Sequence, residues 1–110
     1  MDSERELLKG NTPTLVLAVL NDGPLHGYGI AREIERRSDN ALRFKEGTLY
    51  PALHVLEKKG LIRSEWSTGK NGRERKYCSL TAKGRKAAEE SQRQWSLFTT
   101  AVNAVISNPS

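Results

Sequence analysis

The sequence predicts a single-domain, mainly α-helical fold with one small β-hairpin. Four segments carry apolar residues at three- and four-residue steps, which is typical of helices with one buried face. Between the third and fourth of these, two alternating segments flank an Asn-Gly pair, which indicates a hairpin. At 110 residues the chain is shorter than the length at which chains usually divide into two domains. The predicted order is helix, helix, helix, hairpin, helix.

The first helix is expected to begin at Thr12 and Pro13. Thr12 can accept from the free amides of the first turn, and Pro13 suits the first helical position, where no N–H is needed. A short amphipathic piece around residues 7–8 is expected to precede it. The helix then carries the apolar run 15–20 and ends at the Asn-Asp-Gly-Pro turn of residues 21–24.

The second helix is expected to run from His26 or Gly27 to Ser38. Its inward face consists of Ile30, Ala31 and Ile34, and charged residues lie between them. Residues 39–40, Asp-Asn, end it. Residues 42–44 are expected to form a short extended segment.

The third helix is expected to begin near Gly47 and Thr48 and to end at Gly60. Its core face consists of Leu49, Ala52, Leu53 and Leu56. The opposite face carries hydrogen-bonding and cationic groups, and the free amides of its first turn attract phosphate. The DNA-contact candidates on this helix are Thr48, Tyr50, His54 and Lys58. An ordinary solvated helix face gives the same pattern, so that interpretation stays open.

The hairpin consists of residues 61–67 and 75–80 around the loop 68–72. From Arg63 to Lys86 there are eight basic and two acidic residues, a net charge of +6, whereas the whole chain carries +5. A basic hairpin tip suits a narrow minor groove, whose negative potential attracts Arg and Lys. A solvated turn is the alternative.

The contact candidates on the hairpin are Lys70, Asn71, Arg73 and Arg75. Strand alternation puts Arg73 and Arg75 on one face and Lys76 on the other. Lys76 is therefore expected to flank the contact as a phosphate candidate.

Thr81 can cap a long final helix that runs to about Ile106. Its apolar stripe is long for a helix attached to so small a domain, so we expect a second copy of the chain to cover it. The expected interface residues are Trp95, Phe98, Val102 and Val105, together with Leu15 and Val19 of the first helix. Packing of this helix on its own first helix is the alternative, and both arrangements are compatible.

Several function classes are disfavoured. One cysteine, Cys78, excludes an intramolecular disulfide and a thiolate metal cluster. His26 and His54 each lack a second ligand at helical spacing, which argues against a metal site. No nucleophile with a nearby base and no phosphate-binding glycine loop is present, so we expect no enzyme and no cofactor. The longest apolar run, residues 15–20, is far short of the roughly 20 residues of a membrane span, and the N-terminus lacks a signal pattern, so we expect a cytoplasmic protein without membrane contact.

Three helices followed by a basic hairpin predict a winged helix-turn-helix domain in residues 1–80, and a dimerisation helix with a short polar tail in residues 81–110. Such a chain is expected to be a homodimeric transcriptional repressor that binds double-stranded DNA at an inverted-repeat operator. The alternative is a winged-helix module that binds another protein and not DNA.

Five stretches, in order, resemble the PadR family of transcriptional regulators. They are LHGYGI (25–30), EGTLYPAL (46–53), LEKKGLI (56–62), GRERKY (72–77) and LTAKG (80–84). The resemblance implies a winged helix-turn-helix dimer that represses genes, often its own and frequently those for detoxification or export.

By this resemblance the DNA-contacting helix is Gly47–Lys59, the supporting helix His26–Ser38 and the wing Trp66–Tyr77, and Tyr28 joins the DNA-binding candidates. The long second-domain helices of larger members are absent. The resemblance also implies that two Trp95 indoles at the two-fold axis can bracket a small flat aromatic effector. An interface tryptophan without a ligand is the plainer interpretation.

Overall fold

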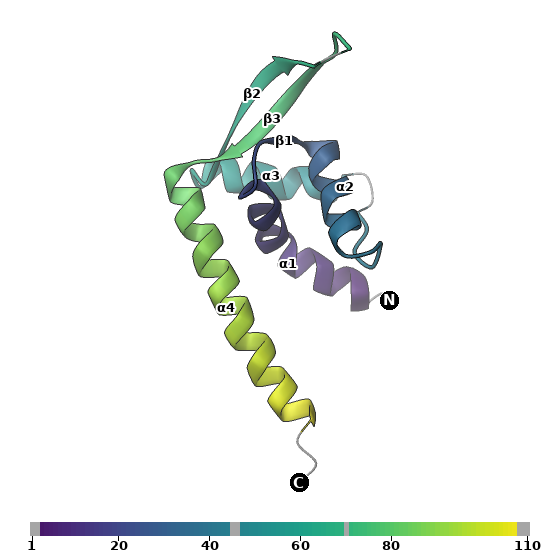
Figure 1. Ribbon diagram of the computed structural model, residues 1–110, viewed down its shortest axis with the longest axis vertical. Coiled ribbons are helices and arrows are strands. Elements are labelled where there is room, and N and C mark those ends of the chain that lie inside the picture. Colours follow the sequence, from purple (N-terminus) through teal and green to yellow (C-terminus); the bar gives the residue numbers. More distant parts are fainter. Residues whose placement is uncertain (1–2, 45–46, 70, 108–110) are drawn as a thin grey trace.

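The computed structural model describes residues 3–44, 47–69 and 71–107, with side chains from Gly10 onward. The elements are α1 (Ser3–Leu20), β1 (Leu25–His26), α2 (Gly27–Arg37), α3 (Leu49–Lys58), β2 (Ile62–Thr68), β3 (Glu74–Leu80) and α4 (Ala82–Ser107). The strands form one antiparallel sheet in the order β1-β3-β2. Helices α1 to α3 gather at the base of the sheet, and the hairpin β2–β3 extends beyond them (Figure 1). The predicted fold class is confirmed.

Helix α1 differs from its prediction at its start. It begins at Ser3, and Pro13 lies inside it, so the prediction that Thr12 caps the helix is wrong. Thr12 is 2% exposed, within the helix, and the ring of Pro13 faces outward. An interior proline removes one backbone hydrogen bond, and the buried residues that follow it, Val16, Leu17 and Leu20, hold this half of α1 against the core.

The sheet contains a third strand that the sequence analysis did not predict. Residues 42–44 form no strand; Leu42 and Phe44 pack against the core as partly buried side chains. The strand is β1, in which Leu25 pairs with Cys78 of β3 and His26 pairs with Tyr77. Two residues between a Gly-Pro turn and a helix are too few to show alternation, which is why the sequence pattern did not predict this strand.

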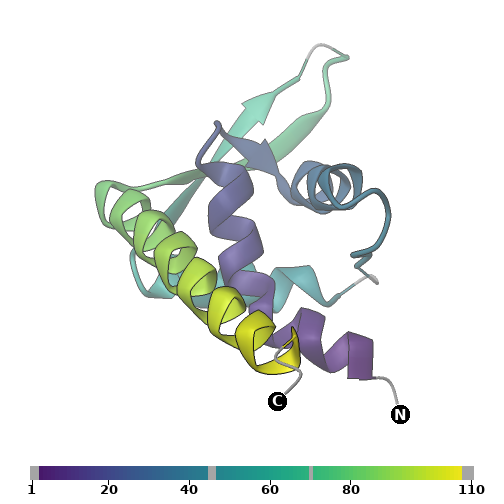
Figure 2. The same cartoon turned by 60° about the horizontal axis from the view of Figure 1, so that its bottom comes forward.

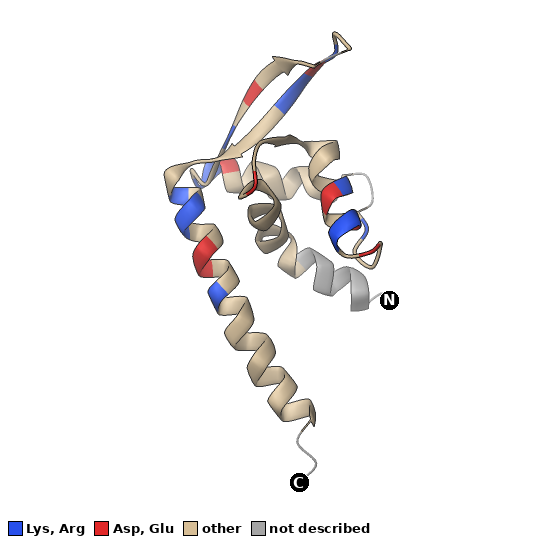
Figure 3. Ribbon diagram, viewed as in Figure 1, with Lys and Arg blue, Asp and Glu red and all other residues tan. Residues whose placement is uncertain are grey.

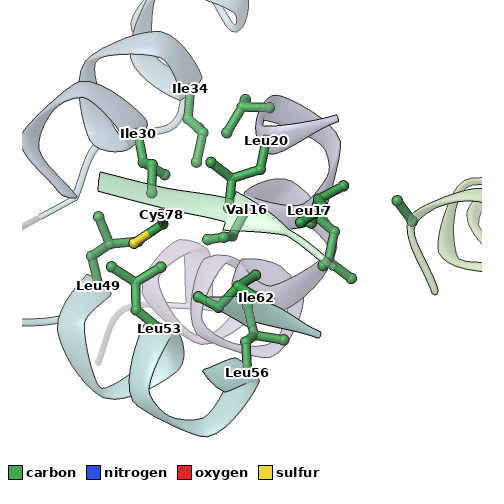
Figure 4. Close-up of a cluster of buried hydrophobic side chains, with 13 residues drawn as sticks. Val16, Leu17, Leu20, Ile30, Ile34, Leu49, Leu53, Leu56, Ile62 and Cys78 are labelled. Atoms are coloured by element: carbon green, nitrogen blue, oxygen red, sulfur yellow. The ribbon is translucent and has the colours of Figure 1, made fainter. Parts of the chain in front are cut away.

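The core lies between the first three helices and the base of the sheet (Figure 4). Its members are Val16, Leu17, Val19, Leu20, Ile30, Ile34, Leu49, Leu53, Leu56, Ile62, Cys78, Leu80 and Ala88. The inward faces predicted for α2 and α3 are confirmed by their buried leucines and isoleucines. Cys78 is a buried strand residue whose thiol pKa is raised by desolvation.

The turn between α3 and β2 fixes the start of α4. The Thr81 hydroxyl accepts from the Gly84 N–H at 3.0 Å, as predicted for the cap, and donates to the carbonyl of Gly60 at 2.6 Å. The Thr81 N–H donates to the carbonyl of Leu61 at 3.0 Å. A Cβ at Gly84 would stand 1.9 Å from that same Leu61 oxygen, so the helix approaches the turn as closely as only glycine allows.

Helix α4 continues well beyond this contact. The described molecule measures 60 × 31 × 22 Å, and α4 runs past α1 and away from the sheet (Figures 1 and 2). After Ala88 none of its residues 89–107 is buried. Its far half therefore presents apolar side chains to solvent in the single chain. Among the helices that the structure describes, none combines the length and the apolar composition that crossing a bilayer requires.

Candidate nucleic-acid interface

One open hollow, of about 730 Å³, lies between the β2–β3 hairpin, hereafter the wing, and the N-terminal ends of α2 and α3. Its lining residues are His26, Gly27, Tyr28, Tyr50, Trp66, Arg73, Arg75 and Lys76. Apart from Gly27, aromatic rings and cations make up this lining, and among the described residues no carboxylate lines it. Such a surface suits a polyanion that also offers flat faces and hydrogen-bond acceptors, and a nucleic acid has all three properties.

Four of the predicted DNA-contact residues, Tyr28, Tyr50, Arg73 and Arg75, line the hollow. Thr48, His54, Lys58 and Asn71 lie outside its lining, and Lys70 lies outside the described residues. The side chains of His54, Lys58 and Asn71 are exposed, whereas Thr48 is half-buried and makes no side-chain capping bond. The structure thus gathers the tyrosines and wing arginines into one site and leaves the C-terminal half of α3 as a separate exposed surface.

Tyr50 presents its ring at the start of α3 because Gly27 gives it room. The ring is 61% exposed, and its Cε1 and hydroxyl oxygen lie 2.9 Å from the position that a Cβ on Gly27 would occupy. Tyr28, the next residue on α2, is also 61% exposed, and the guanidinium of Arg32 lies 5.7 Å from its ring centre. Tyr28 and Tyr50 therefore both line the hollow from the N-terminal ends of α2 and α3, with their hydroxyls available as hydrogen-bond donors.

The wing contributes a residue that the sequence pattern did not single out. Trp66 of β2 pairs with Lys76 of β3, so both side chains lie on one face, and the indole is 69% exposed. Arg75 occupies the other face with Tyr77, yet both Arg75 and Lys76 reach the hollow. Lys76 thus lines the same hollow as the arginines, and its expected role as a flanking phosphate contact stays a prediction. Cross-strand pairing could have located Trp66 from the hairpin register alone.

His26 is the second residue that the sequence pattern passed over. Its Nδ1 accepts from the Gly29 N–H at 3.0 Å and so caps α2. The Nη1 of Arg75 lies 3.1 Å from its Nε2, and Tyr28 and Tyr77 contact the ring by stacking and edge-on, with centroids 6.3 and 5.4 Å away. Desolvation, and then the charge of Arg75, lower the pKa of His26 below 6.5. The ring is therefore neutral at neutral pH.

Some of the described cations are bound in ion pairs. Figure 3 shows where basic and acidic residues lie along the ribbon. On α2, Arg36 and Arg37 both bind Glu33 at 2.7 Å, and Arg37 also binds Asp22 at 2.5 Å. Hydrogen bonds from Arg36 and Arg37 lower the pKa of Glu33 to about 2. Within residues 3–44, 47–69 and 71–107, Arg73 makes no such ion pair, so its charge is available to an external anion.

The far half of α4 carries the expected interface stripe. Trp95, Phe98 and Val105 are 45%, 60% and 79% exposed, and Val102 is half-buried. The rings of Trp95 and Phe98 contact each other with centroids 6.0 Å apart. By helical periodicity Ile106, 75% exposed, extends this stripe, although the sequence analysis did not include it.

The two candidates on α1 fare differently. Leu15 is half-buried and packs beside the core, so part of its surface is free. Val19 is 3% exposed and belongs to the core of its own chain. The expectation that Val19 contributes to an interface is therefore wrong, because a partner can reach almost none of its side chain.

Comparison with known proteins decides the family. The family profile of the PadR-like transcriptional regulators matches residues 16–90. The chain belongs to this family. PadR-like proteins are DNA-binding transcription regulators and not enzymes, so the predicted class is confirmed.

Individual relatives agree over most of the chain. A PadR-like transcriptional regulator from Bacillus cereus is 27% identical, has a TM-score of 0.80, and is matched over 92% of this chain and 96% of that one. A PadR family regulator from Clostridium difficile is 31% identical with a TM-score of 0.76, over 88% of this chain and 99% of that one. A transcriptional regulator of Mycobacterium tuberculosis is 35% identical over 81% of this chain and 79% of its own length.

Proposed function

We propose that this PadR-like chain is a sequence-specific repressor that binds, as a homodimer in the cytoplasm, an operator with inverted-repeat symmetry. The observation that carries the proposal is the hollow, where exposed tyrosines, a tryptophan and wing cations from distant parts of the chain meet on one surface. Repression requires only that the bound dimer occupies promoter DNA. The assignment of residues 1–80 to DNA binding and of residues 81–110 to dimerisation is part of this proposal.

In this mode α3 enters the major groove and the wing follows the adjacent backbone and minor groove. Tyr50 stands at the leading end of α3, and His54 and Lys58 follow on its exposed side. Arg73 and Lys76 supply phosphate contacts from the wing. Lys70 and Asn71 at the hairpin tip are proposed to reach the minor groove.

The α4 stripe supports dimerisation on energetic grounds. Burying one large apolar side chain stabilises by about 1.5–3 kcal/mol. Four apolar side chains of α4 are substantially exposed in the single chain: Trp95, Phe98, Val105 and Ile106. In a symmetric dimer each of them is buried in both protomers, so its contribution counts two times. Two-fold symmetry then presents two reading helices to successive major grooves, about 34 Å apart, which is the reason for an inverted-repeat operator.

A small planar aromatic effector is proposed to bind between the two Trp95 rings and to release the DNA. Trp95 is exposed and its ring contacts that of Phe98, and both observations support this proposal. Titration of a Trp66→Phe variant, in which Trp95 is the remaining tryptophan, with a panel of planar aromatic compounds should quench its fluorescence. A flat response to the whole panel removes the effector from the proposal.

The DNA proposal is tested by fluorescence anisotropy with the chain's own upstream DNA over a series of salt concentrations. Tyr50→Ala and Lys58→Ala should each weaken binding, while Arg73→Ala and Lys76→Ala should also reduce the salt slope by about one unit each. Arg93→Ala is the matched control, because Arg93 is bound to Glu90 on α4, away from the hollow. A wild-type chain that binds no DNA fragment at low salt favours a protein-binding module instead.

The dimer proposal is tested by sedimentation. Phe98→Glu places a charge on the stripe and should yield monomers. Thr100→Glu is the control, since Thr100 is exposed on the opposite side of α4. Identical behaviour of both variants would argue against the α4 interface.

A further inference from the structure

His26 connects two parts of the DNA-binding surface. It is the last residue of β1, where it pairs with Tyr77 of the wing strand β3, and it is also the N-cap of α2. Its Nδ1 accepts from the Gly29 N–H at 3.0 Å, so in the neutral ring the proton resides on Nε2. One side chain thus belongs both to the wing and to the end of the supporting helix.

The same ring holds a wing cation. The Nη1 of Arg75 lies 3.1 Å from Nε2 and 3.4 Å from Nδ1 of His26. Because Nη1 is nearly equidistant from the two ring nitrogens, and because Nε2 carries the proton, the guanidinium lies over the face of the ring rather than at the end of a hydrogen bond. A cation over the face of a neutral aromatic ring is a favourable contact.

This contact distinguishes Arg75 from its neighbours. Arg73 and Lys76 line the same hollow as exposed side chains, whereas Arg75 is half-buried. A long cationic side chain loses rotamer freedom when it binds, and a side chain that is already held loses less. A contact that orders Arg75 in the free protein therefore lowers the entropic cost of its contact with DNA.

We propose that His26 is a positioning residue for DNA binding, whose ring holds the Arg75 guanidinium in the hollow in the orientation that meets a backbone phosphate. The inference rests on the proposed function, since it assigns a role within the same hollow. His26 acts through Arg75 and need not touch the DNA itself. Its second role, the α2 cap, is separable because a smaller acceptor can replace it.

A double-mutant cycle separates these roles. His26→Asn keeps a good capping acceptor but removes the ring. Arg75→Ala is expected to weaken operator binding on the order of tenfold, and His26→Asn several-fold. If His26 acts through Arg75, the double variant binds no more weakly than Arg75→Ala alone. The matched cycle of His26→Asn with Arg73→Ala should be additive, because Arg73 lines the hollow without contacting His26.

Urea unfolding of His26→Asn at fixed protein concentration checks that the cap is retained. Should this variant unfold, Arg75→Lys provides a second test of the proposal. This substitution keeps the positive charge, removes the planar guanidinium and leaves the His26 cap of α2 intact. Arg75→Lys is then expected to weaken binding several-fold.

The outcomes separate the two proposals. Additivity in both cycles, or an Arg75→Lys variant that binds as tightly as wild type, overturns the positioning role while leaving the DNA-binding proposal in place. A folded wild-type chain that binds no DNA overturns the proposed function, and the positioning role with it.

Discussion

Gly84→Ala tests the junction that joins residues 1–80, the proposed DNA-binding part of the chain, to α4. Elsewhere in a helix, replacing glycine with alanine is favourable by up to about 1 kcal/mol, because glycine loses more backbone entropy on folding. At Gly84 the added Cβ would stand 1.9 Å from the carbonyl oxygen of Leu61 and 3.3 Å from Cδ2 of Leu80. The nearest atom is backbone, so it cannot move aside as the end of a flexible side chain does.

The magnitude follows from these opposing terms. Overpacking against a fixed neighbour costs typically 1–3 kcal/mol, and a 1.9 Å contact belongs at or above the upper end of that range. Any shift of α4 that relieves the contact also weakens the cap from Thr81 to the Gly84 N–H, a contribution of about 1 kcal/mol. We expect a net loss of about 2 kcal/mol in the free energy of unfolding, which lowers the melting temperature by roughly 10 °C for a domain of this size.

The assay is urea unfolding followed by circular dichroism. The protein concentration is held constant because the proposed dimerisation would make stability concentration-dependent. Gly10→Ala is the matched control: Gly10 lies within α1, and its Cβ would meet nothing within 4 Å. The control should be unchanged or stabilised, by at most about 1 kcal/mol. A Gly84→Ala protein as stable as the Gly10→Ala protein would refute the close approach of α4 to the turn.

Three further predictions concern the Thr81 cap of α4, the space that Gly27 leaves for the Tyr50 ring, and the protonation of His26. Thr81→Ala should lower the free energy of unfolding by about 1–2 kcal/mol in urea melts, and Thr81→Ser should restore most of it, because the hydroxyl both accepts and donates a hydrogen bond. Gly27→Ala should weaken operator binding as Tyr50→Ala does, with an unchanged urea midpoint, because the three atoms nearest to its Cβ all belong to the exposed Tyr50 side chain, at 2.9–3.1 Å, which can move aside. A lowered midpoint would contradict this. Since the folded-state pKa of His26 lies below 6.5, the unfolded chain binds the proton more tightly, so stability is lost as pH falls below about 6.5 through the lowered pKa; His26→Asn should flatten this part of the pH profile of urea midpoints.

The parts of the fold that depend on regular periodicity were predictable from the sequence. The inward face of α2, the leucines of α3 and the Asn-Gly hairpin all repeat over enough residues to reveal their period. The start of α1 was not predictable in this way, because a proline after a threonine resembles a helix start even where the chain is already helical. Strand β1 has two residues and owes its existence to pairing with β3, a long-range contact that no local pattern contains.

The candidate site follows the same division. Tyr50 and the wing cations were predicted because they lie on exposed faces of elements whose period was clear. Trp66 and His26 were not, since their importance comes from neighbours that are distant in sequence. The expectation for Val19 failed for a related reason: the apolar face of α1 is wide, and only the packed helices show which part of it remains for a second chain.

One short turn links the three functional elements of this PadR-like chain. Residues 59–61 end α3 and lead directly into the wing, and the start of α4 is bonded to the same residues through Thr81 and through Lys83, whose Nζ donates to the carbonyl of Lys59 at 3.0 Å. The carbonyl of Leu61 both accepts from Thr81 and limits the approach of Gly84. Because α3, the wing and α4 share this anchor, a change in the angle of α4 must either break these bonds or carry the end of α3 and the base of the wing with it. In the proposed dimer, the distance between the two copies of α3 is therefore set at this turn. Substitutions here should alter the preferred half-site spacing before they alter the contacts made within one half-site.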